Sequence, residues 1–241
     1  MAPEKTTEAQ KLAKSVLSIK KKYKKGLSIV VCPPFVHISS VAKVSKSLII
    51  GGQSVSETFD IAQTGLVSAG MLKSFGVQYC IVGHSEARAR GESNDMVAQQ
   101  VVRLLEKKVT PIVCVGENVR DHQGWYLSVV KDQLESFLSV LSKPMLKNIV
   151  LAYEPIWAIG KDAVREATVL ECREMIIFIR KIISDHFGQK AGDAVRILYG
   201  GSVDDKNAKN FITEGSASGL LVGRVSLDSK RFGALASSLV S

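Results

Sequence analysis

The chain has 241 residues, of which 46% are hydrophobic, 23% are charged and 6% are aromatic, and this composition excludes a disordered, collagen-like or disulfide-framework protein. Its four cysteines lie far apart with no CxxC pair, so we expect neither a structural metal nor disulfides, and a reducing cytoplasm fits best. The formal net charge is +9, no apolar run approaches the length of about 18 residues that spans a membrane, and no signal peptide opens the chain.

The first predicted element is a helix over residues 7–23, and much of the positive charge lies along it and just after it, at Lys20, Lys21, Lys22, Lys24 and Lys25. A basic patch can bind phosphate backbones without sequence specificity. No zinc-finger or RNP-like motif follows the lysines. We therefore favour a solvated helix face, and nucleic-acid binding stays as an alternative that a steep salt dependence of DNA binding would support.

Short, nearly continuous apolar runs predict strands of a parallel sheet that is buried on both faces, at residues 28–32, 48–50, 79–82, 111–115, 149–153, 196–199 and 220–222. Helical spacing predicts helices at residues 7–23, 95–108, 123–141, 167–186, 206–213 and 229–240. This alternation indicates right-handed strand–helix–strand units. No linker interrupts it, so we expect a single domain over residues 1–241.

The strand count leaves two architectures open. A doubly wound sheet tolerates seven strands, whereas a closed (β/α)₈ barrel needs eight, and this chain opens on a helix. Glycines follow most of the predicted strands, which places loops with special backbone needs at one end of the sheet. Ligands bind at that end in either architecture.

A histidine follows the strand at 79–82, in the string Gly83-His84-Ser85-Glu86. A histidine that opens a helical turn is disfavoured as the imidazolium by the helix dipole, and the neutral ring can donate a hydrogen bond to a developing enolate oxygen. A structural histidine is the more common alternative for a single residue of this kind.

A glutamate follows the strand at 149–153, in the string Tyr153-Glu154-Pro155-Ile156-Trp157-Ala158-Ile159-Gly160. At the mouth of a loop with apolar neighbours, desolvation raises the basicity of a carboxylate toward what proton abstraction from carbon requires. The loop itself, which carries a tryptophan and ends in glycine, suits a lid over a substrate. The alternative is a glutamate that caps a helix.

Two glycine-rich strings near the C-terminus, at residues 199–203 and 219–226, follow consecutive predicted strands. Such turns can present backbone N–H groups to a phosphate. Their position matches the phosphate site that the last two loops of many β/α barrels build.

Five strings together resemble the triosephosphate isomerase family in order and spacing, from about residue 30 to the C-terminus: Gly83–Glu86, Cys114–Glu117, Tyr153–Gly160, Tyr199–Val203 and Gly219–Gly223. The resemblance implies a TIM (β/α)₈-type barrel that interconverts dihydroxyacetone phosphate and D-glyceraldehyde 3-phosphate in glycolysis and gluconeogenesis. It also implies a cytoplasmic protein without cofactor or metal, whose partner is a small phosphorylated triose and which binds neither nucleic acid nor membrane.

The resemblance assigns roles residue by residue. Glu154 matches the base that moves a proton between the substrate carbons, and His84 matches the neutral electrophile that polarises the carbonyl, a pair well known in this family. Gly160, Ser202, Gly223 and Arg224 match the positions whose backbone N–H groups hold the phosphate. Ile159 and Leu221 match the apolar residues that press on the base when the lid closes. Glu86 matches a carboxylate that supports the catalytic residues, and Cys114 matches a buried position below the site.

The N-terminus departs from the family pattern. The chain begins Met1-Ala2-Pro3-Glu4 where the family's first strand, which ends in Asn-Trp-Lys, should already have ended. We therefore expect seven strands and low or absent turnover, because that asparagine and lysine line the family's site. Met1 is either an internal methionine of a longer protein or the start of a genuinely shortened form. A barrel that keeps a phosphate cradle but turns over little is the alternative function.

The surface that the family uses for dimerisation also departs from the pattern. The family's glutamate in the third loop is Leu66 here, and the first arginine after Ser-Glu is Ala87. Those two family residues form an ion pair near the dimer contact, and losing both avoids an unpaired buried charge. The family is homodimeric, but we expect this chain to be a monomer or a dimer that is built differently.

Overall fold

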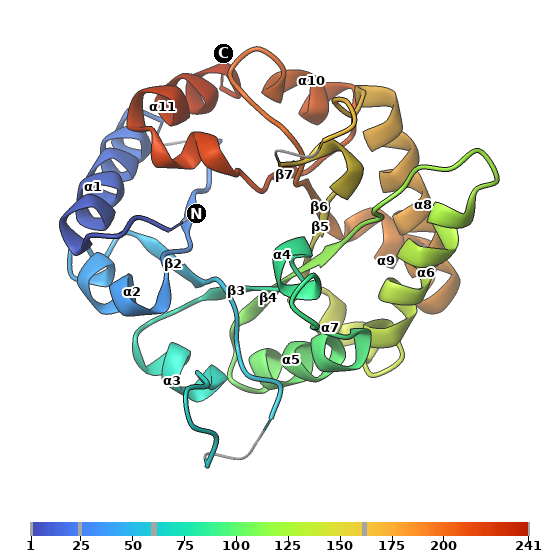
Figure 1. The fold of residues 1–241 in the computed structure, drawn as a ribbon, viewed down its shortest axis with the longest axis horizontal. Coiled ribbons are helices and arrows are strands. Elements are labelled where there is room, and N and C mark those ends of the chain that lie inside the picture. The colour runs from blue at the N-terminus through green and yellow to red at the C-terminus, as the bar shows by residue number, and fades with distance from the viewer. Residues whose placement is uncertain (1, 24–25, 59–61, 161–162, 241) are drawn as a thin grey trace.

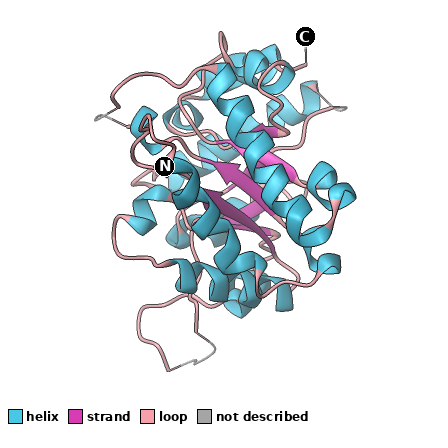
Figure 2. Cartoon of the chain, turned by 90° about the vertical axis from the view of Figure 1, so that its right-hand side faces the viewer, coloured by secondary structure: helices cyan, strands magenta, loops and turns pink. Residues whose placement is uncertain are grey.

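A computed structural model describes residues 2–23, 26–58, 62–160 and 163–240. Its centre is a seven-stranded parallel sheet in which each strand pairs with its neighbours in sequence, in the order β1 to β7 (Figure 2). The strands are β1 (Val30–Val31), β2 (Ile49–Gly52), β3 (Tyr79–Val82), β4 (Thr110–Val115), β5 (Val150–Tyr153), β6 (Arg196–Tyr199) and β7 (Gly219–Leu220). The expected barrel-type architecture with seven strands is confirmed.

Helices form an outer ring around the strands (Figure 1). Within the described residues they are α1 (Thr6–Lys22), α2 (Phe35–Ala42), α3 (Ala69–Ser74), α4 (Ser85–Arg88), α5 (Asn94–Glu106), α6 (Trp125–Leu138), α7 (Lys143–Leu146), α8 (Val169–Phe187), α9 (Gln189–Ala194), α10 (Ala208–Thr213) and α11 (Ser229–Ser238), with 3₁₀ turns η1 (Ile156–Ala158) and η2 (Arg224–Leu227). None of these described helices is both long and apolar enough to cross a membrane.

The central strands bury both of their faces, which explains their nearly continuous apolar sequences. On β4 and β5, one alternate set of side chains points into the barrel, where Ile112, Cys114, Val150 and Ala152 form a small cluster. The other set packs outward against the helices and belongs to the main hydrophobic core. A strand that is covered on both faces has no polar face to alternate with.

The strand layer is open on one side, although the helix layer is closed there. Among the described residues, β1 pairs with β2 alone and β7 pairs with β6 alone. On the outside, α1 packs against α11, and the Tyr23 hydroxyl donates a hydrogen bond of 2.8 Å to Ser237 Oγ. The edge strands are only partly buried, whereas every residue of β5 is buried. The inner sheet therefore has a gap between β1 and β7 that a ring of helices encloses.

The six predicted helices are present, with ends that differ by at most three residues from the predicted ranges. The sequence reading missed the short helices α2, α3, α7 and α9, which have four to eight residues each, whereas α4 is the helical turn expected at His84. So short a segment has too few turns to display a helical period of apolar residues. Lys24 and Lys25 lie outside the described residues, so the solvated face expected there is described only up to Lys22.

Candidate active site

The carboxyl ends of β3 and β5 bring His84 and Glu154 together. His84 follows β3 after Gly83, whose φ of +68° lies in the left-handed region that favours glycine. Glu154 follows β5, and its backbone N–H donates to the Val115 carbonyl at the end of the intervening strand, at 2.8 Å. The result is a distance of 3.1 Å between His84 Nε2 and Glu154 Oε1.

The hydrogen bonds of His84 define which ring nitrogen carries the proton. His84 caps the N-terminus of α4, and its Nδ1 accepts the backbone N–H of Glu86 at 3.2 Å. A nitrogen that accepts a hydrogen bond carries no proton, so the neutral ring holds its proton on Nε2. This Nε2–H points to the Glu154 carboxylate, and the same N–H can donate to a substrate oxygen.

Glu154 is a buried carboxylate with two donors. Glu154 is only 2% exposed, and its Oε2 accepts a hydrogen bond of 2.9 Å from the backbone N–H of Ser85. Burial raises the pKa of Glu154 above its ordinary value, and the nearby His84 and the Ser85 N–H oppose that effect in part. A carboxylate of raised pKa is a stronger base, which suits proton abstraction from carbon.

Two glycines leave room for Glu154. A Cβ on Gly116 would lie 1.8 Å from the Glu154 carbonyl oxygen, and a Cβ on Gly200 would lie 2.9 Å from its Cγ. Any larger residue at position 116 would collide with the backbone of the next strand. The glycines at the ends of β4 and β6 therefore leave the space that Glu154 occupies.

A partly buried network of hydrogen bonds holds the backbone of Gly83. The Gly83 N–H donates to Glu92 Oε2 at 2.9 Å, and its carbonyl accepts from Arg88 Nε at 2.8 Å. Gln100 Nε2 donates to the other oxygen of Glu92 at 2.7 Å, whereas Arg88 Nη1 donates to Asn94 Oδ1. Both polar groups of Gly83 are thus bonded, which fixes the direction in which His84 leaves the strand.

The raised pKa of Glu154 has a consequence for stability. The folded state holds the proton of Glu154 more tightly than the unfolded state does, so ionisation of this residue costs stability as the pH rises from about 4.5 through the raised pKa. In the Glu154→Gln variant this loss is absent. We expect urea unfolding between pH 4.5 and 7.5 to show a stability difference that grows in favour of the variant with increasing pH. The buried Glu117 titrates in both proteins and cancels, so parallel pH profiles would contradict the prediction.

Hydrogen bonds and a stacking contact hold the segment that follows Glu154 in place. Glu117, which is 1% exposed, accepts hydrogen bonds on Oε1 from Trp157 Nε1 at 2.7 Å and from the Tyr153 hydroxyl at 2.9 Å. Burial raises the pKa of Glu117, and these two donors oppose the rise. The guanidinium of Arg165 stacks over the Trp157 ring, with 4.5 Å between its central carbon and the ring centroid. Residues on both sides of the loop tip are therefore anchored to the barrel.

The residues predicted to hold phosphate lie on three loops at the same end of the sheet. Ser202 follows β6, Gly223 and Arg224 follow β7, and Gly160 follows η1 with a φ of +83°. In the described part of the chain, the backbone N–H groups of Ser202 and Gly223 have no hydrogen-bond partner. Unpaired donors on neighbouring loops can bind an anion.

The two predicted lid residues lie on different loops. Leu221 packs against the apolar cluster inside the barrel, and its N–H donates to the Tyr199 carbonyl at 2.9 Å. Ile159 is partly buried and follows η1 directly. The residues Lys161 and Asp162, which continue the same loop, lie outside the described residues.

The two predicted supporting residues act differently. Cys114 is fully buried, and burial together with the neighbouring Glu154 raises the pKa of its thiol. Glu86 has an exposed side chain and contributes to the site through its backbone N–H. No three His, Cys, Asp or Glu side chains of the described residues gather as a metal ion would require.

Sequence reasoning gave no role to Glu92 or Gln100, and it named Gly116, Glu117 and Gly200 only as members of longer strings. The signal for the two glycines was present, because each directly follows a strand that neighbours β5. The signal for Glu92 and Gln100 was weak, since their contacts are with backbone atoms that only the folded chain brings near.

Comparison with known proteins gives a consistent result. A sequence model described as "Triosephosphate isomerase" matches residues 1–239. The chain is 38% identical to the triosephosphate isomerase of Alkaliphilus oremlandii over 214 residues, which is 87% of this chain and 86% of the relative. It is 37% identical to that of Caldanaerobacter subterraneus over 230 residues, which is 94% of this chain and 91% of the relative. It is also 39% identical to that of a Thermoanaerobacter species over 208 residues, or 85% and 83% of the two chains.

Proposed function

The chain belongs to the triosephosphate isomerase family, and we propose that Glu154 and His84 carry out the proton transfers of that reaction. The single observation that carries the proposal is the 3.1 Å contact between His84 Nε2 and the buried Glu154 carboxylate. It joins a base and a hydrogen-bond donor in a space that glycines keep clear. The substrate is dihydroxyacetone phosphate or D-glyceraldehyde 3-phosphate.

The geometry supports a division of labour. The Glu154 carboxylate takes a proton from the substrate carbon next to the carbonyl, and the electron pair moves to the carbonyl oxygen to form an enediolate. The Nε2–H of His84 donates to that oxygen as its charge develops, and the proton moves between the two oxygens. Glu154 then returns its proton to the other carbon, which completes the isomerisation without any change of oxidation state.

The phosphate binds on the neighbouring loops. Ser202 and Gly223 offer unpaired backbone N–H groups, and Arg224 and Gly160 add donors from the adjoining loops. Ile159 and Leu221 would press on Glu154 when the lid closes and exclude water. We place this activity in a single domain and in the cytoplasm.

Deuterium exchange tests the proposal even at slow turnover. We expect the 241-residue chain, incubated with dihydroxyacetone phosphate in D₂O, to place deuterium on the hydroxymethyl carbon faster than buffer alone does, as followed by proton NMR. Removal of the base in Glu154→Gln should reduce this exchange to the buffer rate, whereas Glu135→Gln on the exposed face of α6 should not change it. Exchange that is equal in the chain and in Glu154→Gln would contradict the assignment.

The open sheet supports a second part of the proposal, that the 241-residue chain is an impaired isomerase. The site lies at the carboxyl ends of the strands, and β1 and β7 each lack a second strand partner among the described residues. Helices alone enclose the barrel there, and we expect a wall without strands to position the site less firmly and to exclude water less completely, which weakens the electrostatic interactions on which the reaction depends. A phosphate-binding barrel of low turnover remains the alternative function.

Light scattering tests the assembly. Leu66 is 43% exposed on the loop after β2, and Arg88, the arginine that follows Ala87, is bonded within its own chain. Leu66 and Ala87 therefore cannot form the ion pair that the family has near its dimer contact. We expect a mass near the 26.1 kDa of one chain, or a dimer that leaves this loop free. A dimer in which hydrogen exchange shows residues 62–68 to be protected would contradict this expectation.

A further inference from the structure

The net positive charge of the chain is confined to one part of it. Residues 9–56 contain nine lysines and no aspartate or glutamate, whereas the rest of the chain carries 23 basic and 23 acidic residues. The whole formal charge of +9 therefore belongs to the segment that forms most of α1 and all of β1, α2 and β2. The catalytic residues lie elsewhere, so the proposed isomerisation does not explain this distribution.

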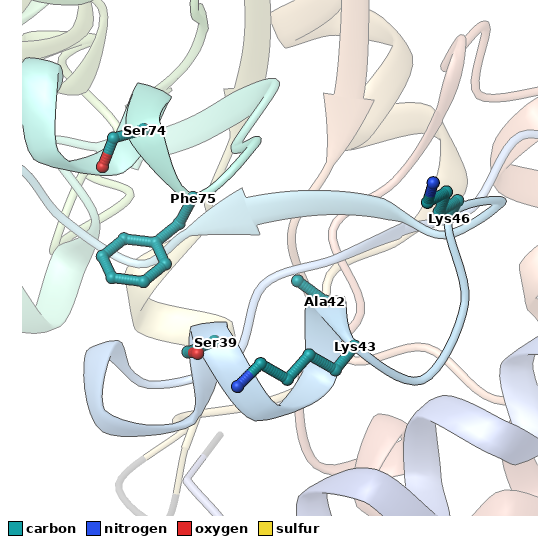
Figure 3. Close-up of a pocket in the computed structure, with 6 residues that line it drawn as sticks. All are labelled: Ser39, Ala42, Lys43, Lys46, Ser74 and Phe75. Atoms are coloured by element: carbon teal, nitrogen blue, oxygen red, sulfur yellow. The ribbon is translucent and has the colours of Figure 1, made fainter.

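The surface of this segment is hollowed beside α2. A hollow of about 540 Å³ lies between α2 and the end of α3, and it is lined by Ser39, Ala42, Lys43, Lys46, Ser74 and Phe75 (Figure 3). Phe75 is 53% exposed, and its ring lies over the same hollow as the long side chain of Lys43. The lining therefore combines the apolar side chains of Phe75 and Ala42 with two serine hydroxyls and two lysines.

A second hollow lies near the first, because the sequence neighbours Lys46 and Ser47 line one hollow each. It has a volume of about 230 Å³ and is lined by Leu17, Lys20, Lys21, Leu27 and Ser47. Lys20 Nζ donates to the Ser47 carbonyl at 2.5 Å. Together the two hollows, which we call the α1–α2 groove, combine apolar lining with four lysines and no carboxylate.

We propose that the α1–α2 groove docks an acidic segment of another protein that carries two apolar anchor side chains. The anchors would fill the hollows beside Phe75 and beside Leu17 and Leu27. Carboxylates between and around the anchors would meet Lys20, Lys21, Lys43 and Lys46. Residues 9–56 contain no aspartate or glutamate that could pair with these lysines instead. Charge of this kind speeds association and selects the partner, whereas the buried anchors supply most of the affinity.

Two other polyanionic partners fit the groove less well. Single-stranded nucleic acid is held by several aromatic side chains on which bases stack, but Phe75 is the one aromatic residue among those that line the hollows. An anionic membrane is met by bulky apolar side chains that project from a helix face. Here the apolar atoms line hollows that receive a side chain.

A labelled peptide tests the proposal by fluorescence anisotropy. The probe is a fluorescein-labelled 12-residue peptide of Asp and Glu, with leucine at its fourth position and phenylalanine at its eighth. We expect saturable binding at 50 mM salt that weakens at 300 mM. The double variant Lys43→Glu/Lys46→Glu should weaken binding by roughly tenfold or more, and Phe75→Ser by roughly fivefold.

Matched controls keep the test specific. Lys147→Glu/Lys190→Glu makes the same change of net charge at exposed sites outside residues 9–56, and Leu170→Ser removes an apolar residue that is 72% exposed on α8. Both should leave the peptide affinity within about twofold. The variant Lys43→Gln/Lys46→Gln repeats the test without charge reversal, if the Glu variant does not fold.

Several results would overturn the proposal. They are an absence of saturable binding, equal binding of a peptide with both anchors changed to serine, and equal weakening by the control variants. Displacement of the peptide by a 12-nucleotide RNA or by anionic vesicles, with no effect of Phe75→Ser, would assign the groove to a nucleic acid or a membrane. None of these readouts depends on turnover, so the result is independent of the proposed isomerase activity.

Discussion

Adding an N-terminal strand that ends in Asn-Trp-Lys should raise isomerase turnover of the 241-residue chain by at least roughly 10³-fold, which corresponds to about 4 kcal/mol of activation free energy. One reason is the geometry of the sheet. Both β1 and β7 have an edge without a strand partner among the described residues. Closure of a barrel fixes the tilt and stagger of all its strands, and the catalytic residues stand at the ends of those strands.

The other reason is charge. In this family the lysine of that strand faces the charge that develops on the enediolate and the phosphate. Loss of one preorganised electrostatic contact costs about 10²–10³ in turnover, or about 2.7–4 kcal/mol. A complete strand wall should also exclude water better than a sheet with two unpaired edges, which would strengthen the proposed contact between His84 and the substrate oxygen. The two effects act on the same developing charge, so we expect them to compound.

Three proteins separate the two effects in a coupled assay that measures isomerisation. They are the 241-residue chain, the chain extended by the strand that ends in Asn-Trp-Lys, and the same extension with methionine in place of the lysine. We expect the methionine form to regain the stability of a closed barrel but to remain about 10²-fold slower than the lysine form. Equal and fast rates for all three would contradict the prediction and would point to Arg224 as the source of the charge.

The parts of the fold that depend on burial could be predicted from the sequence. β3 and β6 match their predicted ranges, because apart from the exposed Arg196 at the start of β6 their residues are apolar or aromatic and are buried or partly buried on both faces. β1 is shorter than predicted, two residues instead of five. Its apolar run continues past the ladder, but a strand is defined by its hydrogen-bonding neighbour, and β1 has one neighbour within the described chain.

Residues whose side chains carry the proposed chemistry could be predicted from the sequence, whereas residues that act on or through backbone atoms could not. Glu154 and His84 are recognisable because the proposed chemistry rests on their side chains. Glu92 holds Gly83 through a backbone N–H, and any glutamate brought to that place by folding could do so. Gly116 is required by its distance to a carbonyl oxygen on the next strand, a contact that exists only once β4 and β5 are paired.

Shortening the proposed base by one methylene should have the second large effect. The Glu154 carboxylate is held by Ser85 N–H at 2.9 Å and by His84 Nε2 at 3.1 Å, and Gly200 bounds its Cγ. An aspartate at this position keeps the charge but withdraws the carboxylate by about 1 Å or more. Misplacement of a reacting group by about 1 Å costs about 10²-fold in rate.

We therefore expect Glu154→Asp, made in the extended chain so that the rate is measurable, to lower kcat by about 10²-fold. KM should change little, because the substitution leaves the proposed phosphate-binding residues Ser202 and Gly223 untouched. Glu135→Asp on the exposed face of α6 provides the matched control for the same chemical change. An unchanged kcat in Glu154→Asp would exclude Glu154 as the carbon base. A fall confined to KM would instead place Glu154 in substrate binding, since uniform binding energy changes KM without changing the barrier from the bound substrate.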